Sequence, residues 1–219
     1  MRYENEMIAP IKACLAGVWE NSVVVDELGV GYGVADVVAA RPSADGVRQR
    51  LRLGQTATLP RRAEVQVIRA LRESEGATLD LLVELTGIPA RRLRYDVLRF
   101  LLVENYIERI GGDAFHLLGG YRPVAEEVWA VEAKIKNWFE GLCQAKRYQH
   151  FAHKSFLAIA DCHRHRVRDE TLREHNVGLI VVSEGMAEVV FQPRWREPRS
   201  EEMFLLTNER FWEQIRSLA

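Results

Sequence analysis

Hydrophobic positions recur along the chain with two different periods, which predict alternating helices and strands. Apolar side chains recur every three or four positions in residues 4–20, and this spacing predicts a helix with one buried face. Two runs rich in β-branched residues follow at 22–28 and 34–40, with glycines between them. Such runs, bounded by turn-forming residues, predict a β-hairpin.

The middle of the chain has a different pattern. Residues 42–60 lose the hydrophobic period and gain proline, glycine, serine and arginine, so we interpret them as a basic linker. Residues 61–118 predict three helices followed by a small hairpin. Thr78 is suited to capping the second helix, and Pro89 to opening the third. This order resembles the winged helix-turn-helix family, on pattern alone.

Strands and helices alternate again after residue 120. The predicted strands cover residues 128–135, 155–160, 177–183 and 187–192, and the predicted helices cover 138–152, 168–175 and 204–218. Two of these strands contain continuous apolar runs, as expected of strands buried on both faces. We therefore expect one α/β domain formed by residues 1–41 and 121–219 and interrupted by the insert.

Composition and charge restrict the class of protein without identifying it. The formal net charge is −1, with 47% hydrophobic and 28% charged residues, which is ordinary for a globular protein. No apolar run has the roughly 20 residues that cross a bilayer, and the N-terminus lacks the apolar core of a signal peptide. We therefore expect a cytoplasmic protein. Three scattered cysteines suggest neither a disulfide framework nor a zinc site.

Charged residues interrupt two apolar strands. Because side chains alternate along a strand, Glu132 and Lys134 project to one side and Ala133 to the other. Asp36 similarly lies inside an apolar run. Burying such charges is costly unless they pair or bind something, so these positions predict a site with chemistry.

An aspartate on one strand and Glu-x-Lys on the next resembles the signature of the PD-(D/E)XK nuclease superfamily. The matching residues are Asp36, Glu132 and Lys134, while Ala35 departs from the family's proline. The resemblance implies a restriction-endonuclease-like mixed central sheet flanked by helices. Here it would be interrupted by the winged helix-turn-helix insert.

The resemblance also implies a divalent metal, Mg²⁺ or Mn²⁺, and hydrolysis of phosphodiester bonds. Asp36 and Glu132 would supply carboxylate ligands and Ala133 a carbonyl oxygen, with Glu4 as a further ligand. Lys134 would orient or help deprotonate the attacking water and stabilise charge on the phosphate. Glu4 is equally open to interpretation as an ordinary acidic residue in the first turn of a helix.

Gln144 and Tyr148 lie four residues apart on the predicted helix after Glu-x-Lys, so they share a face. They resemble the Q-x-x-x-Y element of RecB-type superfamily members, which would place them in the catalytic site. The alternative is a hydrogen-bonded pair on an amphipathic helix.

The third predicted helix of the insert has a basic face. Its candidate nucleic-acid contacts are Arg91, Arg92, Tyr95 and Arg99, and Arg109 on the hairpin could add another. The alternative is a protein-docking or dimerisation surface. Cys162 and His163 have no second pair at zinc spacing, so a polar loop is expected there.

These patterns predict a metal-dependent nuclease acting on DNA, in phage defence or DNA repair. An RNA substrate stays open, as does a homodimer or a larger protein complex. The alternative from another class is a catalytically inactive DNA-binding or scaffold subunit that keeps the fold.

Overall fold

The computed structural model describes residues 3–29 and 33–218. By contacts within the chain it divides into two compact units. Unit 1 comprises Met1–Pro42 and Ala125–Phe204, and unit 2 comprises Ser43–Val124 and Leu205–Ala219. No helix in the described ranges combines the length and the apolar character needed to cross a bilayer.

Unit 1 is a mixed α/β structure with a central six-stranded sheet. The strands are β1 (Val23–Gly29), β2 (Val34–Pro42), β6 (Ala125–Lys134), β7 (Lys154–Ala160), β8 (Val177–Ser183) and β9 (Met186–Phe191). They follow the order β1-β2-β6-β7-β8-β9. The β6–β7 and β7–β8 pairs are parallel and the other pairs antiparallel, so the sheet is mixed.

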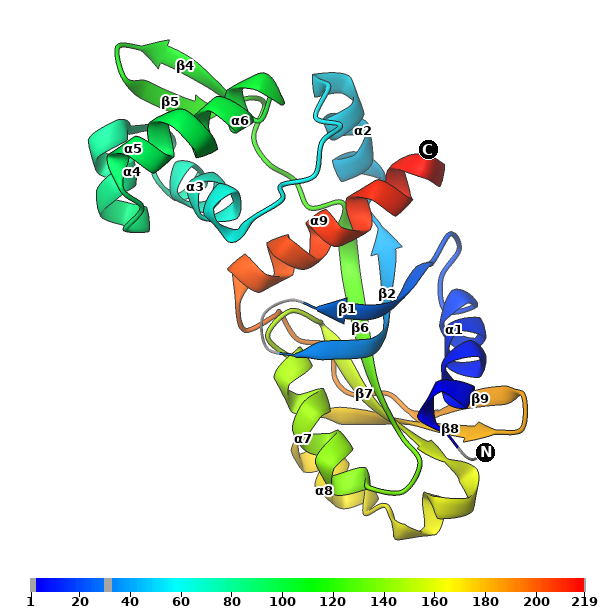
Figure 1. Cartoon of the computed structure of the whole chain (residues 1–219). Helices are drawn as coiled ribbons and strands as arrows, with labels where there is room; N and C mark the ends of the chain where they lie inside the picture. Colours follow the sequence, from blue (N-terminus) through cyan, green and yellow to red (C-terminus); the bar gives the residue numbers. More distant parts are fainter. Residues whose placement is uncertain (1–2, 30–32, 219) are drawn as a thin grey trace. The chain divides into compact units, whose positions relative to one another are not determined.

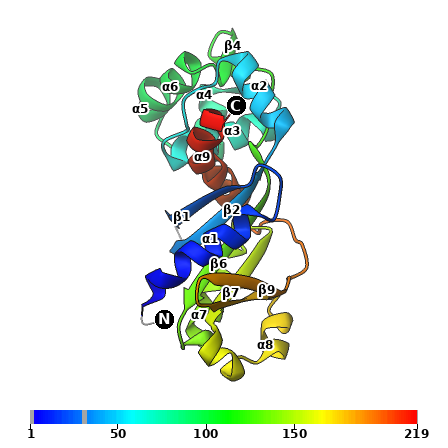
Figure 2. The same ribbon diagram turned by 90° about the vertical axis from the view of Figure 1, so that its right-hand side faces the viewer.

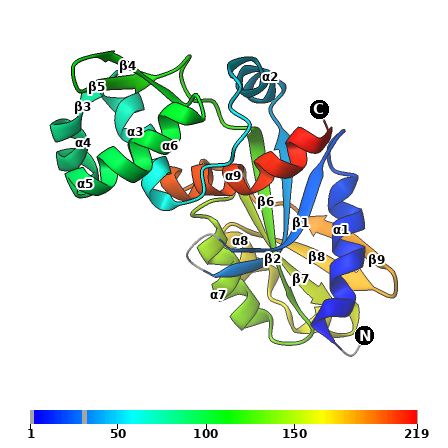
Figure 3. The same cartoon turned by 45° about the horizontal axis from the view of Figure 1, so that its top comes forward.

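Helices cover both faces of this sheet. One face carries the 3₁₀ turn η1 (Glu4–Met7) and α1 (Ile8–Ala16). The other carries α7 (Trp138–Tyr148) and α8 (Asp169–Glu174). Figure 3 shows the strands between α1 and α7, and Figure 2 shows α1 along the near face. The short η3 (Asp161–Arg166) connects β7 to α8.

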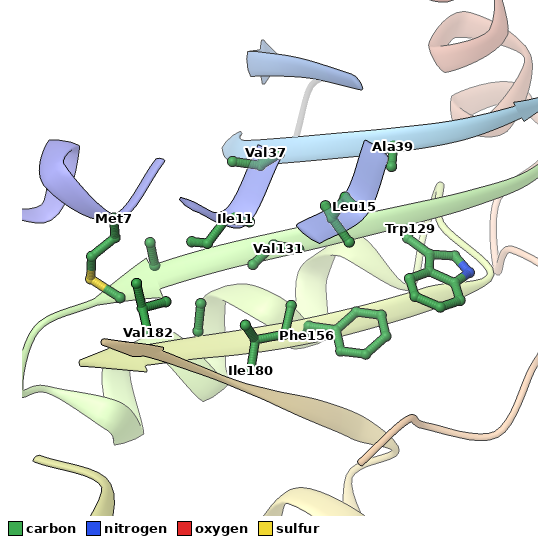
Figure 4. Packing of buried hydrophobic residues seen from close by; sticks show 12 residues of the cluster. Met7, Ile11, Leu15, Val37, Ala39, Trp129, Val131, Phe156, Ile180 and Val182 are labelled. Atoms are coloured by element: carbon green, nitrogen blue, oxygen red, sulfur yellow. The ribbon is translucent and has the colours of Figure 1, made fainter. Parts of the chain in front are cut away.

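The core under α1 follows from the predicted helical period. Met7, Ile11 and Leu15 are fully buried against Val37 of β2 and Val131 of β6 (Figure 4). Burial of each such side chain contributes about 1.5–3 kcal/mol. The predicted hairpin of β1 and β2 and the doubly buried strands β7 and β8 are confirmed.

Unit 2 begins with a helix that the sequence pattern did not predict. Residues 42–60, interpreted as a linker, contain α2 (Ala44–Leu53). The Ser43 hydroxyl accepts a hydrogen bond from the Gly46 N–H, and Gly54 ends the helix with a positive φ of 71°. Both are standard helix boundaries. The linker prediction was therefore wrong over this range.

The rest of unit 2 contains three helical segments followed by a hairpin (Figure 1). The helical segments are α3 (Arg62–Glu73), α4 (Leu79–Thr86) and the continuous run α5 (Ala90–Arg92), η2 (Leu93–Val97) and α6 (Leu98–Val103). The predicted Thr78 cap is confirmed, since its hydroxyl accepts from the Leu81 N–H. The hairpin strands β4 (Ile107–Gly111) and β5 (Ala114–Leu117) form a small sheet with β3 (Ala77–Thr78).

The C-terminal helix α9 (Glu201–Leu218) was predicted to belong with the sheet domain. From Leu205 onward it belongs to unit 2 instead. Trp212 and Arg216 donate hydrogen bonds to the Thr56 carbonyl, and Glu209 binds the buried Arg50 of α2. Because of these contacts, most of α9 belongs to unit 2, and the two units differ from the predicted domain boundaries.

Candidate active site

The register of β2 and β6 brings the predicted charged residues together. Val37 pairs with Val131, and both belong to the core under α1 (Figure 4). Because side chains alternate along strands, Asp36, Glu132 and Lys134 project to the opposite face, on which α7 packs. The three residues thus share one face of two adjacent strands.

A direct hydrogen bond joins Asp36 to the Glu-x-Lys strand. The Asp36 Oδ2 atom accepts from the Ala133 N–H at 2.7 Å. Partial burial raises the pKa of Asp36, although this hydrogen bond and the charge of Lys134 act in the opposite direction. The hydrogen bond from Ala133 therefore fixes the Asp36 carboxylate in a position where burial removes part of its hydration.

Glu132 is the most deeply buried charge of the group, with 2% of its surface exposed. Its carboxylate accepts a hydrogen bond from the Tyr148 hydroxyl and another from Lys134 Nζ at 2.9 Å. Burial raises the pKa of Glu132, and these two hydrogen bonds only partly offset that effect. Burial likewise raises the pKa of Tyr148, so its hydroxyl keeps its proton and acts as a donor.

Lys134 forms two ion pairs, with Glu132 at 2.9 Å and with Glu4 at 3.7 Å. Burial alone would lower the pKa of this ammonium, but the hydrogen bond and charge of Glu132 outweigh burial and raise it. Lys134 is therefore a cation at neutral pH.

Glu4 lies within the predicted helical range 4–20, but in the 3₁₀ turn η1 that precedes α1 and not on its buried face. Its side chain is 51% exposed. Met7 occupies the buried position instead. Glu4 still reaches the site, because its carboxylate pairs with Lys134.

Helix α7 lies tightly against β6. A Cβ atom added at Gly141 would come within 2.5 Å of Leu157 Cδ1 and 2.9 Å of Lys134 Cγ, so a larger residue would displace these side chains. Tyr148 also lies within hydrogen-bond distance of the Val34 carbonyl, at 2.9 Å. Gln144, one turn earlier, has a buried Oε1 atom without a hydrogen-bond partner in the described part of the chain.

The donor set suits a hard cation such as Mg²⁺. Within residues 3–29 and 33–218, no group of three His, Cys, Asp or Glu side chains is placed to hold a metal. Magnesium, however, is usually bound by one or two carboxylates together with water and phosphate oxygens. The carbonyl and N–H of one strand residue point to the same side, so the Ala133 carbonyl faces the Asp36 side of β6. With Asp36 and Glu132, it completes the set that fits this cation.

The sequence reasoning missed one charge near the site. The Glu27 carboxylate of β1 contributes to the raised pKa of Asp36. Its neighbours Asp26 and Leu28 pair with Val37 and Ala35 across the hairpin. The pairing register of the two predicted hairpin strands would have placed Glu27 near Asp36. The glycine-rich sequence between these strands left that register undefined.

The predicted basic face of the third helical segment lies in unit 2. Arg91, Arg92, Tyr95 and Arg99 are all exposed, as a basic surface requires, whereas Leu93, Val97 and Leu101 are buried. The segment is not a uniform α-helix, because Leu93–Val97 forms a π-helical turn. Arg109 stacks on the Phe115 ring, with its Cζ atom 5.4 Å from the ring centre.

Comparisons with known proteins add little to this description. No family model matches the chain, and no curated protein matches it. Among solved structures, a protein of unknown function from Silicibacter pomeroyi aligns with a TM-score of 0.47 and 12% identity. That alignment covers 100% of this chain and 90% of the other.

Proposed function

We propose that unit 1 is a divalent-metal-dependent nuclease of the PD-(D/E)XK type. The observation that carries the proposal is the hydrogen bond from the Ala133 N–H to Asp36, at 2.7 Å. It joins the lone strand aspartate to the Glu-x-Lys strand across 97 residues of sequence. The mixed sheet flanked by helices supports a restriction-endonuclease-like fold.

The chemistry of the proposed site follows from its charges. Asp36, Glu132 and the Ala133 carbonyl would hold Mg²⁺ or Mn²⁺, which supplies charge stabilisation and a water nucleophile when bound. The protonated Lys134 can donate to a phosphate oxygen and stabilise its developing charge. Its raised pKa argues against a role as general base. Tyr148 fixes the Glu132 carboxylate by a hydrogen bond.

For unit 2 we propose a winged helix-turn-helix that binds DNA. Three helical segments followed by a hairpin support this assignment, as does the exposed basic face at Arg91, Arg92, Tyr95 and Arg99. Phosphates would bind the arginines, and Tyr95 is 62% exposed and accessible to base edges.

The main alternative is a catalytically inactive DNA-binding or scaffold subunit. The group of Asp36, Glu132 and Lys134 argues against it, because a desolvation cost that is only partly offset has no structural use. A cleavage assay distinguishes the two functions.

The assay uses labelled single-stranded DNA, duplex DNA and RNA, each with Mg²⁺ or Mn²⁺ and with EDTA. We expect metal-dependent cleavage by the wild type, and a rate at least about 100-fold lower for Glu132→Gln and Lys134→Gln. Glu188→Gln, an exposed glutamate on β9, is the matched control and should leave cleavage unchanged. Binding without cleavage on every substrate would favour the scaffold function, and equal rates for all variants would exclude the proposed site.

A further inference from the structure

A second group of functional side chains lies at the sheet edge where the proposed site is located. Strands β6 and β7 run parallel, with Lys134 paired to Ile159, so both end at the same edge. The chain leaves β6 through Lys136 into α7, and leaves β7 through η3 into α8. Figure 1 shows α7 and α8 together at this end of unit 1.

The two exits pack on one hydrophobic cluster at this end of the sheet. Trp138, the first residue of α7, packs on the cluster that contains Ile159 and Val167. Val167 directly follows η3. Residues 134–139 and 161–168 therefore form one surface beyond the edge of the sheet.

This surface has an excess of exposed cations. The two stretches contain five lysines and arginines and one carboxylate, Asp161, although Lys134 is already paired with Glu132 and Glu140 directly follows the first stretch. Arg164 pairs with Asp169 at 2.7 Å. Lys136, Arg166 and Arg168 are exposed, and among the residues that the structure describes they have no ion-pair partner. An exposed, unpaired cluster of this kind attracts phosphates.

An aromatic side chain stands out of the same surface. Phe139, in the first turn of α7, is 60% exposed. The Trp138 ring supports it edge-on, with the ring centres 5.9 Å apart. We name Lys136, Trp138, Phe139, Arg166 and Arg168 the rim patch.

We propose that the rim patch binds single-stranded DNA and delivers an unpaired strand to the site of Asp36, Glu132 and Lys134. A base would stack on Phe139, and the flanking phosphates would bind Lys136, Arg166 and Arg168. Aromatic stacking requires an open base face, which a paired duplex does not offer, whereas cations alone would accept either form. Lys136 is well placed for this role, because its Cα lies within about 7 Å of that of Lys134. Only the delivery of the strand to the site rests on the proposed nuclease function. The binding of single-stranded DNA to the rim patch does not.

The test measures binding of the full chain in EDTA by fluorescence anisotropy. The probes are a labelled DNA single strand of about 12 nucleotides and the duplex of the same sequence. Phe139→Ala should weaken single-strand binding on the order of 10-fold and leave duplex binding unchanged, and Phe139→Tyr should keep the affinity. Arg166→Ala combined with Arg168→Ala should lower the salt dependence of single-strand binding by about 1.4 in log–log slope.

Two exposed positions of unit 1 away from this edge provide matched controls. Val190→Ala shortens an exposed apolar side chain near the end of β9, and Arg147→Ala removes a cation from the last turn of α7. Neither should change single-strand affinity. The proposal is overturned if Phe139→Ala binds the single strand like the wild type, or if single-strand and duplex affinity fall equally.

Parallel cleavage assays with Mg²⁺ separate this inference from the proposed function. If Phe139→Ala binds and cuts like the wild type while Glu132→Gln is inactive, the rim patch fails and the nuclease proposal stands. If no variant cuts DNA but Phe139→Ala loses single-strand affinity, the rim patch stands as a binding surface and the nuclease proposal fails.

Discussion

Asp36 and Glu132 are partly withdrawn from water on the same face of the sheet, and burial raises the pKa of both. A carboxyl whose pKa is higher in the folded state than in the unfolded state destabilises the fold once it is ionised. The free energy of unfolding begins to fall as the pH rises above the pKa of the unfolded state, and the fall is complete above the pKa of the folded state. At neutral pH without metal, these side chains therefore cost stability, as functional sites often do.

Replacement of Asp36 by asparagine tests this cost. Asp36→Asn keeps an oxygen that can accept from the Ala133 N–H but removes the charge. We expect a free energy of unfolding higher by up to about 1 kcal/mol in EDTA at pH 7, allowing for solvent screening. Urea titration measures it. Asp26→Asn on β1 is the control with the opposite sign, because a hydrogen bond from Lys12 lowers the pKa of Asp26.

His153 should make unit 1 sensitive to acid. Burial lowers its pKa to about 4, and its Nδ1 atom accepts a hydrogen bond from the Val128 N–H. The unfolded chain therefore binds the proton more readily, and stability falls as pH drops from about 6.5 to 4. We expect His153→Asn to reduce this loss by about 1–2 kcal/mol. Urea unfolding at pH 7 and pH 4.5 measures the difference, and an unchanged pH dependence would contradict it.

The candidate site could be predicted largely at the residue scale. Asp36, Glu132 and Lys134 were identifiable because each interrupts an apolar strand, and the alternation of strand side chains placed the latter two on one face. The exposure of Glu4 could not be predicted, because a helical period does not define where a preceding 3₁₀ turn begins. Glu27 could be assigned to the site only from the pairing register of β1 and β2.

At the scale of elements, α2 and α9 depend on one buried ion pair in unit 2. Arg50 of α2 is 1% exposed and donates to Glu209 of α9 and to the Tyr121 hydroxyl at 2.8 Å. Its guanidinium lies 5.0–5.5 Å from the ring centres of Tyr106, Tyr121 and Trp212. Glu209 also accepts from the Leu59 N–H at 2.9 Å. The network connects three segments that are distant in sequence.

Breaking this pair should destabilise unit 2 strongly. We expect Arg50→Met to lower the free energy of unfolding by about 3 kcal/mol or more, because Glu209 is left buried without its cation. Arg50→Met combined with Glu209→Leu should recover much of that loss. Chemical denaturation, with hydrogen exchange to locate the change, measures both variants. Arg48→Ala is the control on the same helix, because its exposed pair with Asp45 should contribute little to stability.

Helix α2 shows why some elements escaped prediction. Its sequence contains three arginines and a glycine among ten residues and has a weak apolar stripe, so composition indicated a linker. Tertiary contacts overrode that local signal, since Arg50 is buried only because Glu209, 159 residues away, neutralises it. The π-helical turn at Leu93–Val97 escaped for a similar reason, because a helical period does not reveal one inserted residue.

At the scale of the whole molecule, the two proposed functions are assigned to different units, and this division can be tested. We expect Arg91→Ala combined with Arg92→Ala to weaken duplex binding and to lower its log–log salt slope by about 1.8. Cleavage of a saturating substrate should be retained, because the proposed catalytic residues are unchanged. Binding titrations from low to high salt measure the slope.

The control for that variant removes the same number of cations elsewhere. Arg147→Ala combined with Arg210→Ala changes two exposed arginines, on α7 and α9. A slope that falls equally in both double variants would mean that duplex affinity reflects overall charge and not the face of the third helical segment.

The sequence by itself determined most of the helices and strands, with α2 as the main exception, through hydrophobic period, the Thr78 cap, Pro89 and the glycines of the turns. Each of these signals acts over a few residues, so it can be read locally. Only the tertiary structure decided that β2 pairs with β6 beyond the intervening segment, that α9 packs mostly within unit 2, and that β6 and β7 end at the same edge of the sheet. These pairings depend on the total burial and hydrogen bonding between segments that are distant in sequence. A pattern within a few residues does not carry that information.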